Sequence, residues 1–229
     1  MLELPEEIDA ILFDWDGTLA DSLPLVTRAT NEVLASHGYP ALDASSIHDG
    51  MRFPTARRMA FHIGRAYEEV AGEAETLGEE FYEAADRLGH VAVELFPGVA
   101  DLLARCSMLG VPMALVTNNR ASLIRSLVRH AGFEDAFALI VGEENVRNPK
   151  PDPEGVRIAL ATLDARASRT IFVGDSITDA QAAERAGVVG VGVAWAPDSI
   201  VHGAHNTYEQ ICETPDELLA ALFGDEVFL

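Results

Sequence analysis

Five short runs of apolar, largely β-branched residues stand out along the chain. They are Ile8–Phe13, Val111–Val116, Phe137–Val141, Thr170–Val173 and Val188–Val193. Runs of this length and composition are typical of strands that are buried inside a sheet. The hydrophobic pattern therefore predicts a sheet of five strands.

Helical periodicities separate most of these runs. They cover Val99–Leu109, Ser122–His130, Pro153–Leu163 and Thr178–Ala186. Asp152 is the expected N-cap of the third helix, and Thr178 with Gln181 forms the expected capping box of the fourth. Strands that alternate with helices predict an α/β fold with a mostly parallel sheet.

The stretch between the first two predicted strands is unusually long. From Ala20 to about Ala92 it contains only helical patterns, at Leu23–Ser36, Thr55–Ile63 and Glu68–Leu88. An ordinary crossover between strands needs one helix, so this stretch predicts a separate helical insert. Long insertions of this kind are commonly lids or domains with a function.

Composition narrows the class of protein. The chain has 229 residues, 48% of them hydrophobic, which suffices for one core plus a small accessory domain. A net charge of -21 disfavours nucleic acid as a partner. No apolar run approaches the ~18 residues of a membrane span, and residues 1–7 lack the basic start of a secretory signal. Cys106 and Cys212 read as free thiols, so we expect a cytoplasmic protein.

The first predicted strand runs directly into two acids, Asp14 and Asp16, followed by Gly17. Ligands bind at the carboxyl ends of strands in open α/β sheets. Two carboxylates on an apolar strand end repel each other unless they are paired or bound to a metal. By itself this segment is equally consistent with an ordinary turn rich in Asp and Gly.

Three further segments favour a site. The second strand ends in Thr117-Asn118-Asn119, and the fourth ends in a segment that carries Asp175 and Asp179. Between them lies Lys150, the only lysine of the chain, flanked by two prolines. A compact ammonium held beside carboxylates and a phosphate is one need that arginine does not meet.

Together these segments resemble the four motifs of the haloacid dehalogenase superfamily of phosphatases, and the resemblance covers essentially the whole chain. The motifs are DxDGT at Asp14–Thr18, the Thr/Ser motif at Thr117, the lysine motif at Lys150 and GDxxxD at Gly174–Asp179. The proline-rich segment around Lys150 is most similar to the phosphoglycolate-phosphatase-like and β-phosphoglucomutase-like branch.

The resemblance implies a Rossmann-like parallel sheet with strand order 3-2-1-4-5 and an inserted α-helical cap domain. We therefore expect residues 1–19 and 93–229 to form the core domain and residues 20–92 to form the cap.

The resemblance also implies a mechanism. Asp14 would be the nucleophile, forming an aspartyl-phosphate, and Asp16 would be the general acid and base. Mg²⁺ would be held by Asp14, the backbone carbonyl of Asp16 and Asp175, while Asp179 would ligate the metal or orient Lys150. Lys150 and Thr117 would stabilise the phosphoryl oxygens.

The expected substrate is a small phosphate monoester bound by a monomer or homodimer. Gly17, Thr18 and Asn118 are expected to contact it. In the helical insert, Arg52 could grip a second anionic group, or it could, with Arg57 and Arg58, only solvate a helix.

Several alternatives stay open at this point. A phosphosugar mutase would use Asp14 in the same way, and a non-catalytic binding protein could keep the fold. Dehalogenation is disfavoured, since a halide leaving group needs no proton and Asp16 is present. His202 and His205 are expected to be surface residues, because no third ligand accompanies them.

Overall fold

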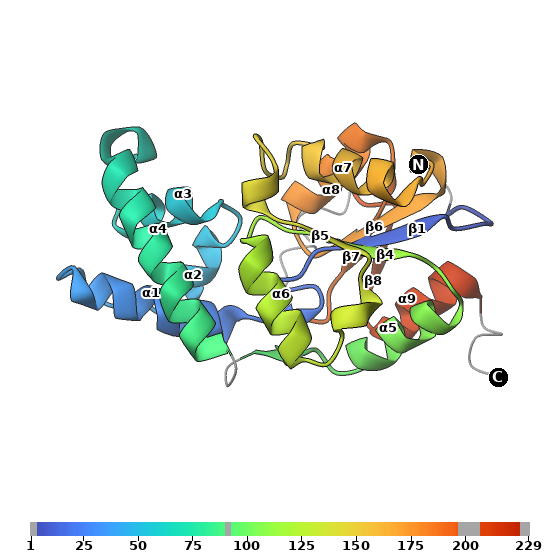
Figure 1. Cartoon of the computed structure of the whole chain (residues 1–229), viewed down its shortest axis with the longest axis horizontal. Coiled ribbons are helices and arrows are strands. Elements are labelled where there is room, and N and C mark those ends of the chain that lie inside the picture. The colour runs from blue at the N-terminus through green and yellow to red at the C-terminus, as the bar shows by residue number, and fades with distance from the viewer. Residues whose placement is uncertain (1–3, 90–92, 197–206, 225–229) are drawn as a thin grey trace.

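The computed structural model describes residues 4–89, 93–196 and 207–224, so His202 and His205 lie outside the described part. Its main sheet is built from six parallel strands (Figure 1). They are β1 (Ala10–Phe13), β4 (Met113–Val116), β5 (Leu139–Val141), β6 (Thr170–Gly174), β7 (Val189–Val193) and β8 (Gln210–Cys212). Their order is β5-β4-β1-β6-β7-β8. This confirms the α/β fold and the order 3-2-1-4-5, to which β8 adds a sixth strand.

Helices cover both faces of the sheet (Figure 1). One face carries α5 (Val99–Met108), α6 (Ala121–His130) and α9 (Pro215–Phe223), and the other carries α7 (Glu154–Leu163) and α8 (Ile177–Ala186). Side chains alternate along β1, so Ile11 and Phe13 pack in one core while Leu12 packs in the other. Burial on both faces explains why the strands read as unbroken apolar runs.

Strand register brings the candidate residues to one edge of the sheet. Phe13 pairs with Leu115 on β4 and with Val173 on β6. Asp14 is therefore the first residue beyond β1, while Thr117 and Asp175 follow directly after the neighbouring strands. Because the three strands are parallel, their carboxyl ends open on the same side.

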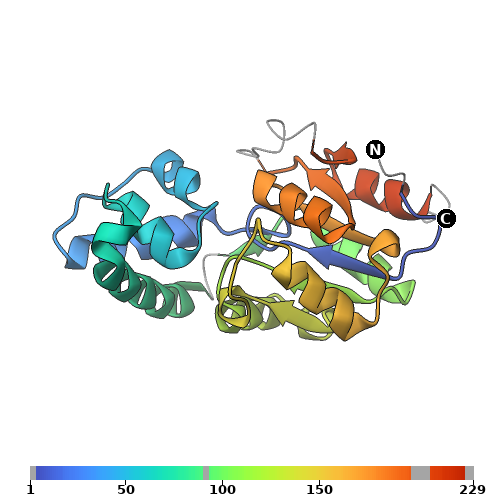
Figure 2. The same ribbon diagram turned by 90° about the horizontal axis from the view of Figure 1, so that it is seen from above.

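The long insert forms a group of helices beside the sheet (Figure 2). These helices are α1 (Leu23–Ser36), α2 (Ala44–Gly50), α3 (Thr55–His62) and α4 (Tyr67–Gly89). The chain enters and leaves through the short antiparallel pair β2 (Ala20–Asp21) and β3 (Glu94–Leu95). The helical content of the insert agrees with its sequence pattern, and its boundaries at 20 and 92 stay a prediction.

Some local details differ from the sequence prediction. The capping box of α8 is formed by Ser176 and Asp179, so the prediction of Thr178 with Gln181 was wrong by two residues. Helix α7 begins at Glu154 with Pro153 as its N-cap, so the prediction of Asp152 was wrong by one residue, although the Asp152 carboxylate accepts the Glu154 N–H at 3.0 Å. Short 3₁₀ turns lie at Glu134–Ala136, Glu143–Asn145 and Ala167–Arg169.

Two further observations bear on the class of protein. Among the described residues, none of the helices has the length and apolar character needed to cross a membrane. Cys106 and Cys212 are free and buried, and burial raises the pKa of each thiol to about 12. Both cysteines are therefore neutral packing groups.

Candidate active site

A cavity lies at the carboxyl edge of the sheet, between the strand ends and the helical insert. It has about 880 Å³ of empty space, counted together with open solvent at its mouth. Eight of the residues predicted for the site line it: Asp14, Asp16, Gly17, Arg52, Thr117, Asn118, Lys150 and Asp175. Thr18 and Asp179 are fully buried behind this lining.

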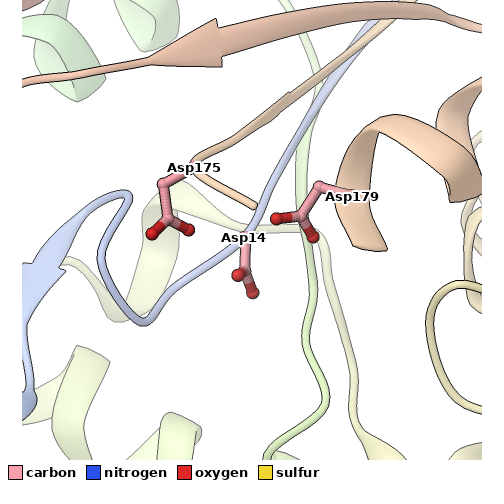
Figure 3. A group of neighbouring side chains, drawn as sticks. All are labelled: Asp14, Asp175 and Asp179. Carbon is pink, nitrogen blue, oxygen red and sulfur yellow. The ribbon is translucent and has the colours of Figure 1, made fainter. Parts of the chain in front are cut away.

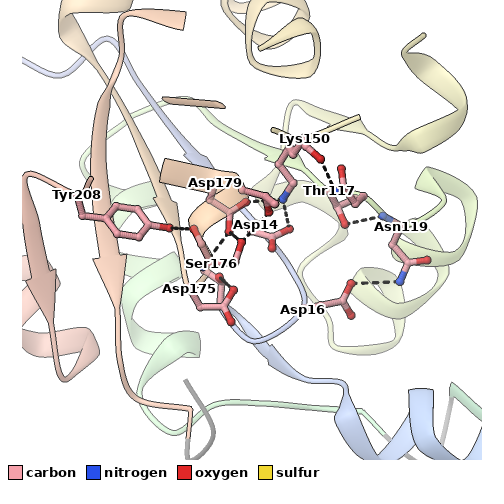
Figure 4. A network of polar contacts seen from close by, with 12 residues as sticks. Asp14, Asp16, Thr117, Asn119, Lys150, Asp175, Ser176, Asp179 and Tyr208 are labelled. Carbon is pink, nitrogen blue, oxygen red and sulfur yellow. Dashed lines mark hydrogen bonds and ion pairs between the residues drawn. The ribbon is translucent and has the colours of Figure 1, made fainter. Parts of the chain in front are cut away.

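Lys150 connects two of the acids (Figure 4). Its Nζ lies 2.8 Å from Asp14 Oδ1 and 2.6 Å from Asp179 Oδ1, and the residue is only 5% exposed. The amide of Asn118 donates to the backbone carbonyl of Lys150 at 2.9 Å, which ties the lysine loop to the end of β4. A buried lysine held in this way keeps its ammonium in one place.

Asp175 is positioned by the loop that follows β1. The hydroxyl of Thr18 donates to Asp175 Oδ1 at 3.2 Å, and the carbonyl of Thr18 accepts from Trp195 Nε1 at 2.8 Å. Gly17 has φ +79°, and a Cβ on it would lie 2.3 Å from Asp175 Oδ2. Only glycine fits this turn, since it needs both a left-handed backbone and a close approach to the carboxylate.

Asp179 is the most constrained of the acids. Its Oδ2 accepts from the backbone N–H of Ser176 at 3.1 Å and from the Ser176 hydroxyl at 2.5 Å. The Tyr208 hydroxyl in turn donates to the Ser176 carbonyl at 2.7 Å (Figure 4). Since Oδ1 faces Lys150, the Asp179 carboxylate contacts both the lysine and the start of α8.

The ionisation of these groups follows from their burial. Burial raises the pKa of the Asp14 carboxyl to about 7, although the positive charge of Lys150 opposes this shift. Burial also raises the pKa of Asp175, and the neighbouring carboxylates add to the effect. For Lys150, burial lowers the pKa, but the charges of Asp14 and Asp179 outweigh it and the pKa is raised. One lysine does not compensate three buried acids, so the site favours a further cation.

The acids also fit a divalent metal. Carboxylate oxygens of Asp14, Asp175 and Asp179 lie within 4.8 Å of one another (Figure 3). Such hard oxygen donors are the ligands that Mg²⁺ prefers. Both oxygens of Asp179 accept hydrogen bonds, whereas Asp175 accepts one only at Oδ1 among the described residues. The donor set therefore fits Mg²⁺, with Asp14 and Asp175 the freer ligands.

Asp16 lies on the cavity side of the same loop and has a partner that the sequence did not reveal. Asn119 Nδ2 donates to Asp16 Oδ2 at 3.2 Å, and the backbone N–H of Asn119 donates to the Thr117 hydroxyl at 3.0 Å. Asn119 is 4% exposed. Its position two residues after Thr117 is the signal that could have identified it, since alternate residues at a strand end share a side.

Two arginines of the insert line the helical side of the cavity. Arg52 is exposed, with its guanidinium 4.8 Å from the centre of the Phe53 ring. Arg58 is 4% exposed and lies 4.4 Å from the centre of the Phe81 ring. The alternative that these arginines only solvate a helix is therefore wrong for Arg58, because α3 turns that residue inward.

Glu143, after β5, joins the insert to the sheet. Its carboxylate accepts the backbone N–H of Thr55 at 3.2 Å and the hydroxyl of Tyr82 at 2.9 Å. The backbone N–H of Glu143 donates to the carbonyl of Asn119, the residue that holds Asp16. Nearby, Arg120 forms a bidentate pair with Glu79 of α4. The two sides of the cavity are thus tied together by charged hydrogen bonds.

Known proteins resemble this chain in both sequence and structure. A phosphoglycolate phosphatase from Rhodobacter capsulatus is 34% identical over 186 residues, which cover 78% of this chain and 81% of that protein. An N-acetylmuramic acid 6-phosphate phosphatase from Pseudomonas aeruginosa is 28% identical, covering 94% and 95% of the two chains. A crystal structure described as a haloacid dehalogenase-like hydrolase from Bacteroides fragilis superposes with a TM-score of 0.84 at 28% identity, over 93% of this chain and 100% of that one.

The family follows from a match that includes the site. The model of the haloacid dehalogenase-like hydrolases matches residues 11–193, which contain all four motifs. The chain therefore belongs to the haloacid dehalogenase-like hydrolase family, as its motifs predict.

Proposed function

We propose that this protein is a Mg²⁺-dependent phosphatase that hydrolyses a small phosphate monoester through an aspartyl-phosphate on Asp14. The observation that carries the proposal is the buried ion pair between Lys150 and Asp14, two residues that line the cavity at the strand ends. A buried carboxylate beside a fixed ammonium can attack phosphorus while the ammonium balances the charge of the incoming phosphate.

Asp14, Asp175 and the backbone carbonyl of Asp16 would hold Mg²⁺. When bound, this ion supplies positive charge that neutralises the phosphoryl oxygens. Lys150 keeps the Asp14 carboxylate oriented, and Asp179 keeps Lys150 in place. Thr117, at the end of β4, would donate its hydroxyl to a phosphoryl oxygen.

Asp16 is proposed as the group that handles the proton. In the first step it would give a proton to the leaving alcohol, and in the second it would take one from the attacking water. Asn119 supports this role because its amide fixes Asp16 Oδ2 on the cavity side. Asn118, Gly17 and Arg52 line the same cavity, where we propose that they contact the substrate. Thr18 is proposed to act indirectly, by orienting Asp175.

The phosphatase names of the relatives support hydrolysis over the mutase alternative. Two of these relatives are named after the compounds on which they act, phosphoglycolate and N-acetylmuramic acid 6-phosphate. Both compounds are phosphate monoesters that also carry a free carboxylate group. We therefore place phosphoglycolate-like and sugar-phosphate-like esters first among the substrates. The reducing cytoplasm is the proposed compartment, in keeping with two free, buried cysteines.

The direct test is phosphate release from a panel of monoesters: phosphoglycolate, sugar phosphates, nucleotides and an aryl phosphate. Each is assayed with Mg²⁺, with EDTA, and with Asp14→Asn as the blank. The proposal expects release that needs Mg²⁺ and falls at least about 1000-fold in the variant. Release that persists in Asp14→Asn would refute the nucleophile, and transfer between sugar hydroxyls without net release would favour the mutase.

A further inference from the structure

Arg58 is a buried cation without an ion partner. The residue lines the cavity, yet no hydrogen bond or salt bridge joins its side chain to any residue that the structure describes, and its Nε and Nη2 are occluded and unpaired. Asp16 and Glu143 are the acids whose negative charges act on Arg58. Both already accept hydrogen bonds elsewhere: Asp16 from Asn119, and Glu143 from Thr55 and Tyr82. A buried charged donor without an acceptor is costly, so this arrangement is kept for a reason other than stability.

The unpaired atoms are the pair that binds carboxylates elsewhere in this chain. Nε and Nη2 of Arg166 donate to the two oxygens of Asp9 at 2.7 and 2.8 Å, and the same atoms of Arg129 donate to both oxygens of Glu134 at 3.1 Å. This edge of a guanidinium matches the spacing of carboxylate oxygens. In Arg58 the same edge has no such partner.

Packing holds the Arg58 guanidinium before any ligand arrives. Its centre lies 4.4 Å from the centre of the Phe81 ring, an arrangement in which the aromatic face attracts the cation. Burial lowers the pKa of Arg58, while the negative charges of Asp16 and Glu143 oppose that shift. An arginine remains charged under these conditions. The site therefore holds one fixed positive charge at the cavity wall, with two buried donors that no described protein group occupies.

The charge of the site favours a singly charged partner. One guanidinium balances one negative charge, whereas a second phosphate would bring about two into a cavity already lined by four aspartates, Asp14, Asp16, Asp21 and Asp175. Arg52 is exposed and stacked on Phe53, so solvent screens its charge more effectively.

We propose that Arg58 is a specificity-determining residue that binds a carboxylate on the substrate, so that the enzyme selects phosphate monoesters that carry a carboxylate. This inference rests on the proposed phosphatase function and adds to it the class of ester. It also places the second anion site not at Arg52, one of the two possibilities that the sequence left open for that residue, but at the buried arginine six residues later.

A matched pair of substrates tests the proposal. 2-Phosphoglycolate carries a carboxylate, and 2-hydroxyethyl phosphate has a hydroxymethyl group in the same position. Arg58→Met is expected to lower kcat/KM for phosphoglycolate by roughly 10- to 100-fold, because a charged hydrogen-bonded pair is lost. It should change kcat/KM for 2-hydroxyethyl phosphate less than about threefold, since that ester gains nothing from the guanidinium.

Two further variants separate recognition from folding. Arg58→Lys keeps the charge and the alkyl chain but loses the paired donors. It should have the melting temperature of the wild type, while its kcat/KM should fall about tenfold for phosphoglycolate and not for 2-hydroxyethyl phosphate. Arg57→Met is the matched control. That residue lies on α3 next to Arg58 but is exposed, beside Glu68 and Tyr67 of α4, so its removal should leave kcat/KM unchanged for both substrates.

Binding provides a measurement that does not require turnover. Calorimetry with 3-phosphonopropionate and propylphosphonate, in Mg²⁺ buffer, should show a preference for the carboxylate in the wild type that Arg58→Met abolishes. The proposal is refuted if Arg58→Met lowers kcat/KM equally for phosphoglycolate and 2-hydroxyethyl phosphate. It is also refuted if Arg52→Ala, rather than Arg58→Met, removes the binding preference for the carboxylate. A loss confined to 1,3-propanediol bisphosphate would also refute it. A wild type that hydrolyses no ester yet binds 3-phosphonopropionate through Arg58 would refute only the phosphatase function.

Discussion

The two sides of the cavity differ in how their charges are compensated. On the strand-end side, Lys150 pairs with Asp14 and Asp179, and each charge is fixed by another part of the protein. On the helical side, Arg58 is equally buried but has no ion partner among the described residues. A paired network keeps its geometry with or without substrate, whereas an unpaired guanidinium gains most when an anion arrives. We therefore assign the chemistry to one side and the selection of substrate to the other.

The sharpest way to break this comparison is to remove the cation of the strand-end side. Lys150→Met should lower kcat about 1000-fold, because the phosphoryl group loses a positive neighbour. It should also lower the free energy of unfolding by about 3 kcal/mol, because Asp14 and Asp179 lose their buried partner. Steady-state kinetics and urea unfolding measure the two effects.

Arg58→Met provides the contrast for that experiment. Since Arg58 has no ion pair to lose, its removal should not lower the free energy of unfolding by more than about 1 kcal/mol. A stability loss as large as that of Lys150→Met would mean that the two sides are built alike, and the comparison would fail.

A second prediction concerns the connection between the two sides. Glu143→Ala removes the acceptor for the Thr55 N–H and the Tyr82 hydroxyl. We expect kcat/KM to fall about tenfold for every ester, because the insert is no longer held against Asn119 and Asp16. Glu83→Ala, an exposed acid on α4, is the control and should have no effect. A loss restricted to carboxylate-bearing esters would instead place Glu143 in substrate selection.

The last prediction concerns a pH dependence of stability and not of activity. His62 in α3 is 9% exposed, and both of its ring nitrogens lack a partner in the described part of the chain. Burial lowers the pKa of His62 from 6.5 to about 4, and the positive charge of Arg58 adds to the shift. Between these values the unfolded chain binds a proton that the folded protein does not, so stability falls as the pH drops below 6.5.

From pH 7 to pH 5 this group should lower the free energy of unfolding by about 2 kcal/mol. His62→Phe should remove that part of the pH dependence in urea titrations. An unchanged dependence in the variant would show that His62 is protonated or solvated in the folded protein.

The strand-end side could largely be predicted from the sequence. Asp14, Thr117 and Asp175 each follow a buried strand directly, and parallel strands bring such positions together. The strand order itself came from the family resemblance, because apolar runs do not say which strands are neighbours. Lys150 was identifiable because it is the only lysine of the chain.

The helical side could not be predicted in the same way. The buried residues of α3 include the polar residues Thr55, Arg58 and His62, whereas Phe61 is 40% exposed. Hydrophobic periodicity therefore predicts the helix but not which of its faces is buried. Which of three nearby arginines turns inward depends on packing against α4, and that is a tertiary property. Short elements such as α2 and β8 were missed because so few residues carry too little pattern.

The central claim is that Asp14 becomes phosphorylated, and the Asp16→Asn variant tests it most directly with 4-nitrophenyl phosphate and Mg²⁺. Nitrophenolate leaves without a proton, so phosphorylation should proceed, while hydrolysis of the aspartyl-phosphate should stall without its base. The account predicts a burst of one nitrophenolate per enzyme and a phosphoryl group on the peptide that contains Asp14. Nitrophenolate and phosphate released in step from the first turnover, with Asp14 unmodified, would contradict it.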